Sequence, residues 1–412
     1  MKPFYPGKSI IPVSGQSISD DDVAVLHEVV DSRWYTDHKY CAEFKRNLAK
    51  YCGKKHVILT NSGSSANLVA MLTALEHFDK DIEKKFVVTT ALAFPTTIAP
   101  IYQSGKLPIY IDINPTTFRP DNAQLFYASN ELSHSIAGAI LTHILGFPFH
   151  ERIHNTLWKF LISDCCDSLG ATMFDKHVGA SADLMTLSFF PAHHITSIEG
   201  GAVLTDNDEL AKIAESYVNW GRSCYCAPGQ SNTCGVRFNW PDNGLLPEHW
   251  DHKYIFDRVG YNLKMTEFQA ALGNSQLSRV ESFVADRVVH YHYYLEYLDK
   301  YNEFLQFIYP EENIEYSPFG FPIIVKDTAP FDAGDLIAWL ESHRVTTRRM
   351  FGGNITRQPG FMNLPYKSFG LAGTDYVANN GFWIGVQPSL TNEMMDYVIE
   401  VFEDFFKENN IE

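Results

Sequence analysis

The chain has 412 residues, of which 45% are hydrophobic, and 33 basic against 49 acidic side chains give it a net charge of −16. This length accommodates a large and a smaller domain, and the apolar content supports a sizeable core, which excludes disorder as the main state. The acidic balance argues against nucleic acid or an anionic membrane surface as the main partner.

No segment reaches the ~20 uncharged apolar residues that span a membrane, and the N-terminal residues lack the apolar run of a secretory signal. The seven cysteines are an odd number in a large chain. They fit a reducing cytoplasm better than a disulfide framework. We therefore expect a cytoplasmic protein of the α/β class.

The predicted elements begin with two helices, in residues 17–32 and 43–53. Short β-rich runs then alternate with helix-length segments, at residues 56–60, 85–90, 107–112, 137–143, 159–164, 183–190 and 201–205. Such alternation predicts a mainly parallel sheet that is covered on both faces. Ligands bind beyond the carboxyl ends of the strands in such sheets, so the residues after each run are candidate site residues.

Residues from about 221 to 260 break this alternation and are rich in Cys, Gly, Pro, Asn and Trp. They predict a long irregular insertion, which in a compact domain is more often functional than idle. Helical patterning resumes at 265–283, and a helix, a strand and two further helices follow. The expected organisation is a large domain over residues 1–284, which includes the insertion, and a smaller α+β domain over residues 285–412.

Small hydroxyl side chains follow the first strand, in TNSGSSANLVAML at residues 60–72. Free N–H groups at the start of a helix, together with the hydroxyls of Ser62, Ser64 and Ser65, can hold a phosphate. Simple N-capping is the alternative. Ser188, near the end of a later strand, can supply a further hydroxyl.

Asp164 ends the apolar run KFLISD, where a buried carboxylate must be paired or functional. One function is to keep a pyridinium nitrogen protonated, which makes a pyridoxal ring an electron sink. A helix cap after the strand is the alternative. Phe94 follows another strand end and could stack on a flat ring, although a core position is the simpler interpretation.

In this order, SGSSANL, AFPTT, the strand ending in Asp164, SFFPAHHITSIEGGAVLTDN and GYNLKMTEFQAAL resemble the DegT/DnrJ/EryC1/StrS family, fold-type I pyridoxal-phosphate enzymes that aminate nucleotide-linked keto sugars. The resemblance implies an aspartate-aminotransferase-like αβα sandwich with a smaller C-terminal α+β domain, and an obligate homodimer. It also implies a set of cofactor contacts: phosphate on Gly63, Ser64 and Ser188, with Asn262 from a second subunit, Phe94 on the ring face, Asp164 on the ring nitrogen and Asp167 near the phenolic edge.

The aminotransferases of this family carry a lysine five residues after the phosphate-binding serine, and here that position is His193. An imidazole cannot form a stable Schiff base, but it can move a proton near neutral pH. The cofactor is therefore expected as unanchored pyridoxamine phosphate, with His193 as the base. This exchange resembles the 3-dehydrases of 4-keto-6-deoxy sugar nucleotides, which serve 3,6-dideoxyhexose synthesis for surface polysaccharides. His194 is expected to be a structural neighbour.

Four cysteines form the pattern Cys-x57-Cys-x-Cys-x7-Cys: Cys166, Cys224, Cys226 and Cys234. Four thiolates can ligate an iron–sulfur cluster or zinc, and free thiols are the third interpretation. The spacing matches neither common ferredoxin pattern, so it does not choose the metal.

The expected dehydrase reaction favours a cluster. Loss of water leaves an unsaturated sugar–cofactor adduct, which needs two electrons to become a deoxy sugar. The spacing also resembles the 2Fe–2S signature that, within this family, marks the dehydrases of CDP-4-keto-6-deoxyglucose. This resemblance implies an NADH-dependent flavin iron–sulfur reductase as partner. Cys165 competes with Cys166 as the ligand.

A basic, glycine-rich segment, TTRRMFGGNITRQP at residues 346–359, contains Arg348, Arg349 and Arg357. Such a loop in an acidic protein can bind the diphosphate of a nucleotide, and a solvated turn is the alternative. Competing functions are a cluster-free dehydratase that uses glutamate and a GDP sugar, a plain sugar aminotransferase, and a zinc-stabilised or degenerate binding protein. The cysteine pattern opposes the first of these and His193 the second.

Overall fold

The predicted β-rich runs form a central eight-stranded sheet in a computed structural model that describes residues 3–79, 84–151 and 157–411. Antiparallel pairing joins β9 to β1 and to β8, and all other pairings in this sheet are parallel. The mainly parallel sheet is as expected. In sheet order its strands are β1 (His56–Thr60), β9 (Gly201–Thr205), β8 (Leu184–Ser188), β5 (Leu161–Asp164), β4 (Ile136–Thr142), β2 (Phe86–Thr90), β3 (Leu107–Ile111) and β14 (Lys367–Ser368).

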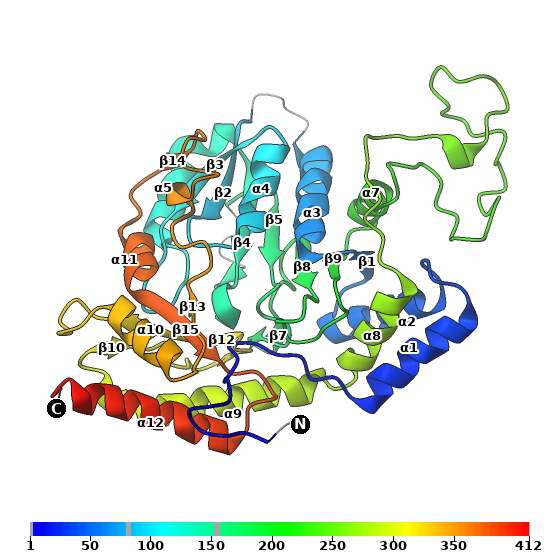
Figure 1. The fold of residues 1–412 in the computed structure, drawn as a ribbon. Helices are drawn as coiled ribbons and strands as arrows, with labels where there is room; N and C mark the ends of the chain where they lie inside the picture. The colour runs from blue at the N-terminus through cyan, green and yellow to red at the C-terminus, as the bar shows by residue number, and fades with distance from the viewer. Residues whose placement is uncertain (1–2, 80–83, 152–156, 412) are drawn as a thin grey trace.

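Helices cover both faces of this sheet (Figure 1). Because successive side chains of a strand point to opposite faces, Ile58 packs with the helices of one face, whereas Val57 and Leu59 pack with those of the other. The first face is covered by α3 (Gly63–Phe78), α4 (Pro95–Gln103) and α7 (Asp208–Val218). The second face is covered by α1 (Asp20–Ser32), α2 (Lys39–Cys52), α5 (Asn122–Leu132) and α8 (Glu267–Leu277).

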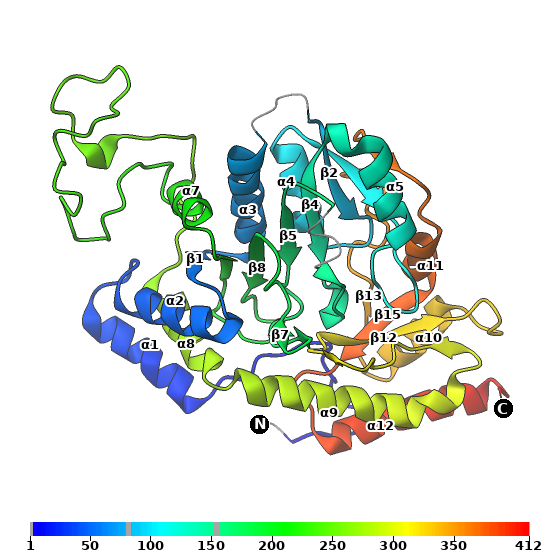
Figure 2. The ribbon, with the colours of Figure 1, turned by 180° about the vertical axis from the view of Figure 1, so that it is seen from behind.

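The C-terminal part contains an antiparallel four-stranded sheet with its own apolar core. Its strands, in sheet order, are β10 (Leu305–Gln306), β12 (Gly320–Val325), β15 (Gly381–Gly385) and β13 (Arg348–Arg349). The helices here are α9 (Val280–Leu298), α10 (Ala333–Ser342), α11 (Ala372–Asn380) and α12 (Asn392–Glu408). α9 and α12 run side by side along the lower edge of the molecule in Figure 2. α9 crosses the domain boundary expected at residue 284.

Short elements complete the described chain, and none of its helices is both long and apolar enough to cross a membrane. A small sheet holds β11 (Ile314–Glu315), β6 (Thr172–Met173) and β7 (Lys176–His177). The single-turn helices are η1 (Ser133–Ser135), η2 (Ile144–Gly146), η3 (His252–Tyr254), η4 (Asp299–Tyr301) and η5 (Ile355–Arg357).

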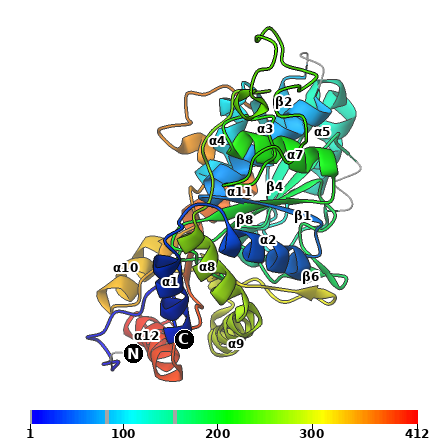
Figure 3. The same ribbon diagram turned by 90° about the vertical axis from the view of Figure 1, so that its right-hand side faces the viewer.

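Residues 221–260, which we call the arm, extend away from the body beside α7 (Figures 1 and 2). In Figure 3 the arm faces the viewer and overlaps α3 and α7. The one-turn helix η3 is the only helix or strand among them. The base of the arm is closed, because the Trp220 N–H donates to the Tyr261 carbonyl at 2.7 Å and the Ser223 N–H to the Ile255 carbonyl at 3.0 Å. The arm therefore leaves and re-enters the body at one place.

Candidate active site

The N-terminus of α3 meets the carboxyl end of β8, as the phosphate prediction requires. Ser62 caps α3, and its hydroxyl accepts the Ser65 N–H at 3.1 Å. A Cβ at Gly63 would lie 2.5 Å from the Ser188 Cβ, so only glycine permits this approach. The exposed Ser64 hydroxyl bonds to the Thr96 hydroxyl at 3.0 Å. Gly63, Ser64 and Ser188 thus lie together at an open helix N-terminus.

Asp164 ends β5 and is only 2% exposed. Asn67 and Thr97 donate to its Oδ2 at 2.9 and 2.7 Å. Its Oδ1 accepts the Cys166 N–H at 3.2 Å, and no cation within the described ranges forms an ion pair with it. Thr186 donates to the Asn67 side-chain carbonyl at 2.6 Å and so fixes the amide. The carboxylate is held rigidly with lone pairs left on Oδ1, as a protonated ring nitrogen requires.

His193 lies in the turn after β8, with its Nδ1 3.6 Å from the Asp167 Oδ1. The Nδ1 is buried and has no hydrogen-bond partner among the described residues. The fully buried Arg287 of α9 donates to the carbonyls of Phe319 at 3.0 Å and of His193 at 3.3 Å. Arg287 therefore ties the His193 turn to the C-terminal part of the chain.

Burial sets the protonation states of this group. Burial, and next the charge of Arg287, lower the pKa of His193 to about 3. Burial, followed by the neighbouring Asp164 carboxylate, raises the pKa of Asp167 to about 8, although the Leu145 backbone and Arg287 oppose this. At neutral pH the imidazole is thus neutral and able to accept a proton, while the Asp167 carboxyl holds one.

The buried His194 plays a different part. Its Nε2 lies 3.0 Å from the Ser317 carbonyl, which connects it to the C-terminal part of the chain. This contact supports its expected structural role.

Phe94 is the N-cap residue of α4 and is 55% exposed, so its ring face is available. The basic segment packs beside it, since the Ile355 N–H donates to the Ala91 carbonyl at 3.1 Å. The three arginines are not equivalent. Arg357 pairs with Asp375, with Nε to Oδ1 at 2.8 Å, whereas Arg349 only donates to the Asn379 carbonyl and Arg348 to the Thr347 carbonyl.

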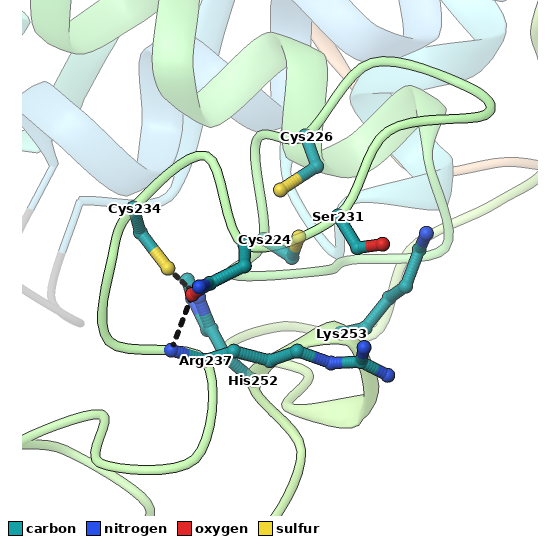
Figure 4. Close-up of a pocket in the computed structure, with 8 residues that line it drawn as sticks. Cys224, Cys226, Ser231, Cys234, Arg237, His252 and Lys253 are labelled. Atoms are coloured by element: carbon teal, nitrogen blue, oxygen red, sulfur yellow. Dashed lines mark hydrogen bonds between the residues drawn. The ribbon is translucent and has the colours of Figure 1, made fainter.

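Three of the four predicted thiols gather in the arm. Cys224, Cys226 and Cys234 line one small pocket together with His252 and the cations Arg237 and Lys253 (Figure 4). His252 is 1% exposed, its Nδ1 lies 3.4 Å from the Cys234 Sγ, and Trp240 stacks on it at 3.5 Å. Burial raises the pKa of Cys226, but hydrogen bonds from Thr233 outweigh it and lower the pKa overall.

Cys166 does not line this pocket and lies in the body, two residues after Asp164. It is half-buried, whereas Cys165 is fully buried, with its Sγ 3.4 Å from the Ser163 hydroxyl. Asn262 lies at the base of the arm, where it is exposed and accepts a bond from Lys264 at 2.6 Å. The structure therefore brings the predicted cofactor and base residues together. Cys166 lies beside them but apart from the other three thiols, and Asn262 lies apart from the cofactor residues.

Four further residues shape the site without having been predicted from the sequence: Asn67, Thr97, Thr186 and Arg287. Asn67 and Thr97 each lie a few residues into a helix that follows a strand, and their spacing from Ser64 and Phe94 turns them inward. This offset was a usable signal. Arg287 had none, because its acceptors are backbone carbonyls far away in the sequence.

The chain is similar to known proteins in sequence and in fold. The chain is 42% identical to lipopolysaccharide biosynthesis protein RfbH of Salmonella typhimurium strain LT2, over 98% of this chain and 94% of that protein. It is 38% identical to dTDP-4-dehydro-2,6-dideoxy-D-glucose 3-dehydratase of Saccharopolyspora spinosa, over 98% of this chain and 88% of that protein.

Among solved structures, the fold is similar to Escherichia coli GDP-4-keto-6-deoxy-D-mannose-3-dehydratase with bound hydrated PLP, with a TM-score of 0.83, 24% identity, and coverage of 95% of this chain and 99% of that one. This likeness confirms the expected fold. The model of the DegT/DnrJ/EryC1/StrS aminotransferase family matches residues 16–403, which confirms the expectation of an enzyme. The chain belongs to the DegT/DnrJ/EryC1/StrS aminotransferase family.

Proposed function

We propose that this protein is a pyridoxamine-phosphate-dependent 3-dehydrase of a nucleotide-linked 4-keto-6-deoxyhexose, with CDP-4-keto-6-deoxy-D-glucose as the substrate. It works in the cytoplasm as a homodimer, in the synthesis of 3,6-dideoxyhexoses for surface polysaccharides. Two relatives support the reaction class, since their names describe 3-dehydratases of nucleotide sugars.

One observation carries the proposal: a neutral, buried imidazole stands where the aminotransferases of the family have a lysine. His193 lies in the turn after β8, five residues after Ser188, with its Nδ1 3.6 Å from the Asp167 Oδ1. A side chain that moves protons but forms no stable covalent bond to the cofactor favours elimination over transamination. Oxygen would then leave the carbon next to the sugar ketone.

The residues present fit pyridoxamine phosphate. Gly63, Ser64 and Ser188 supply an open helix N-terminus and hydroxyls for the phosphate. Asp164, held by Asn67 and Thr97, offers its Oδ1 to the ring nitrogen. When bound, the cofactor supplies an amine for the sugar ketone and a ring that withdraws electrons.

The protein's own groups carry the proton transfers. His193 accepts a proton at its neutral imidazole, and the protonated Asp167 beside it limits the build-up of negative charge around the site. Arg287 fixes the backbone of His193 through the carbonyl, so the ring stays in place while its protonation changes. Arg348, Arg349 and Arg357 are the candidates for the substrate diphosphate.

We further propose a 2Fe–2S cluster on Cys166, Cys224, Cys226 and Cys234, which accepts single electrons from an NADH-dependent flavin iron–sulfur reductase. Two electrons and two protons convert the dehydrated sugar to the deoxy sugar. Lys253 beside the thiols offsets part of the negative charge of a thiolate-bound cluster, whereas Arg237 is already paired with Asp251.

The test is a spectrum and a metal analysis of the purified protein. We expect reddish-brown cluster bands, iron and sulfide in equal amounts, and a near-ultraviolet pyridoxamine band. We also expect turnover of the CDP sugar that depends on the reductase. Borohydride that fixed the cofactor to a lysine would contradict the proposal. Zinc without iron, with glutamate-dependent turnover of a GDP sugar, would instead identify the cluster-free dehydratase.

A further inference from the structure

The thiol set of the arm is incomplete within one chain. Cys224, Cys226 and Cys234 share a pocket, while Cys166 lies in the body beside Asp164 and does not line it. The arm extends away from the body on the α7 side (Figures 1 and 2). A cluster that needs all four thiols must therefore obtain the fourth from elsewhere, or the arm must refold.

The internal contacts of the arm argue against refolding. Its two ends are joined at the base by backbone hydrogen bonds, including the Asp257 N–H to the Gly221 carbonyl at 2.9 Å. Around the pocket, Arg237 Nε donates to Asp251 Oδ1 at 2.8 Å, and the His252 N–H donates to the Arg237 carbonyl at 2.7 Å. These bonds tie the thiol-bearing segment together, and the Arg258 guanidinium pairs with Glu76 of α3 at 2.8 Å, which holds the base of the arm against the body.

The outer surface of the arm is unusually apolar for a projecting loop. Its large exposed side chains are Tyr225, Val236, Phe238, Leu245, Leu246, Trp250, Tyr254, Phe256 and Val259. An exposed apolar surface of this kind is typical of a protein interface. Tyr225, which is 66% exposed, lies between Cys224 and Cys226 in the sequence. An interface that included Tyr225 would therefore reach the thiol pocket.

The rim of the candidate active site offers a matching surface. Phe94 and Phe190 are 55% and 47% exposed. The Phe190 ring lies 6.4 Å from the His193 ring, and His193 lies beside Asp167, the residue after Cys166. The half-buried Cys166 is thus close to an exposed aromatic rim.

We infer that the arm docks on the active-site rim of a second copy of this chain, where the partner subunit's Cys166 completes the set of Cys224, Cys226 and Cys234. Each dimer then holds two thiol sites, and each site lies between the chains, next to the cofactor of the chain that supplies Cys166. This inference rests on the proposed function, because it assigns the ligands of the proposed cluster.

Hybrid dimers test the inference. One chain carries Cys166→Ser and the other Cys224→Ser, each with its own affinity tag, so that only the hybrid is purified. With sites between chains, one site lacks both thiols and the other keeps all four. We expect half of the wild-type iron and sulfide, and half of the electron paramagnetic resonance signal after reduction.

The matched control places both substitutions in one chain and pairs it with a wild-type chain. Each shared site then lacks one thiol, and we expect no cluster. Sites within single chains would reverse the two results, with no iron in the first hybrid and half in the second, and would overturn the inference. Full iron in a Cys166→Ser homodimer would also overturn it. A wild-type dimer without iron would instead contradict the proposed function, so the two failures are distinguishable.

Discussion

The candidate active site contains Gly63, Ser64, Ser188 and Asp164, which together we call the cradle. The cradle and the arm place reactive side chains by opposite means. In the cradle, Asp164 and Ser188 end adjacent strands, and buried hydrogen bonds from Asn67 and Thr97 hold the Asp164 carboxylate. In the arm, the thiols lie on irregular backbone, and the hydrogen bonds around their pocket join residues of the arm to one another. The cradle is thus held by the sheet and its buried hydrogen bonds, whereas the arm is closed on itself and its pocket contains only three of the four predicted thiols.

Replacing His193 by Asn should have the largest effect and tests the cradle alone. The amide cannot accept a proton, and general base catalysis is worth about 10²–10⁴-fold. We expect dehydration to fall by at least ~10³-fold in single-turnover assays, while the pyridoxamine absorbance shows that the cofactor stays bound. Retained turnover would remove His193 from its role.

Removing the arm would separate the two regions. Ser223 and Ile255 are already hydrogen-bonded across its base, so two glycines in place of residues 224–254 should close a hairpin. We expect a folded, cofactor-binding protein without iron, measured by circular dichroism, absorbance and metal analysis. A body that fails to fold without the arm would contradict the independence of the two regions.

Asp164→Asn weakens the cradle without changing its shape. The amide keeps the volume but loses the charge that would stabilise a protonated ring nitrogen, so kcat should fall ~10²-fold. Cluster content should stay unchanged in the same preparation. Loss of iron as well would mean that the carboxylate also supports the Cys166 region.

The pH dependence of stability should report on Asp167. Between pH 6.5 and 8 His193 is neutral in the folded state and at most half protonated in the unfolded state. Asp167 is protonated only in the folded state, because burial raises its pKa to about 8. The free energy of unfolding therefore falls as pH rises through this window, by up to about 2 kcal/mol.

Below pH 6.5 the lowered pKa of His193 has the opposite sign and offsets this trend, since the unfolded imidazole then binds a proton that the folded one does not. Urea unfolding of the cofactor-free wild type and of Asp167→Asn measures the difference. The variant should lose the decline between pH 6.5 and 8. An identical decline in both proteins would contradict the raised pKa.

The smallest expected effect concerns the arginines beside the cradle. Arg357 is already paired with Asp375, whereas the Arg349 guanidinium donates to the Asn379 carbonyl and forms no ion pair within the part of the chain that the structure describes. Arg357→Ala should change KM for the nucleotide sugar by less than about threefold, as for other exposed ion pairs. Arg349→Ala should raise it more. The reverse order would show that Asp375 releases Arg357 to the substrate.

The sequence by itself determined the sheet and the cradle. Strand runs followed by small or acidic residues predict where Gly63, Ser188 and Asp164 lie, because the carboxyl ends of parallel strands share one edge. The helices that follow β1 and β2 then bring Asn67 and Thr97 to the same carboxylate. The residue at the lysine position was readable for the same reason, since its spacing from Ser188 is local.

Only the tertiary structure decided what depends on distant backbone. Arg287 is buried against carbonyls about 30 and more than 90 residues away, which no local pattern encodes. The cysteine spacing gave four thiols but not their positions, because the direction of an irregular segment is set by how its ends are tied. Three thiols lie in the arm and the fourth lies in the body, and this separation supports the proposed site between two chains.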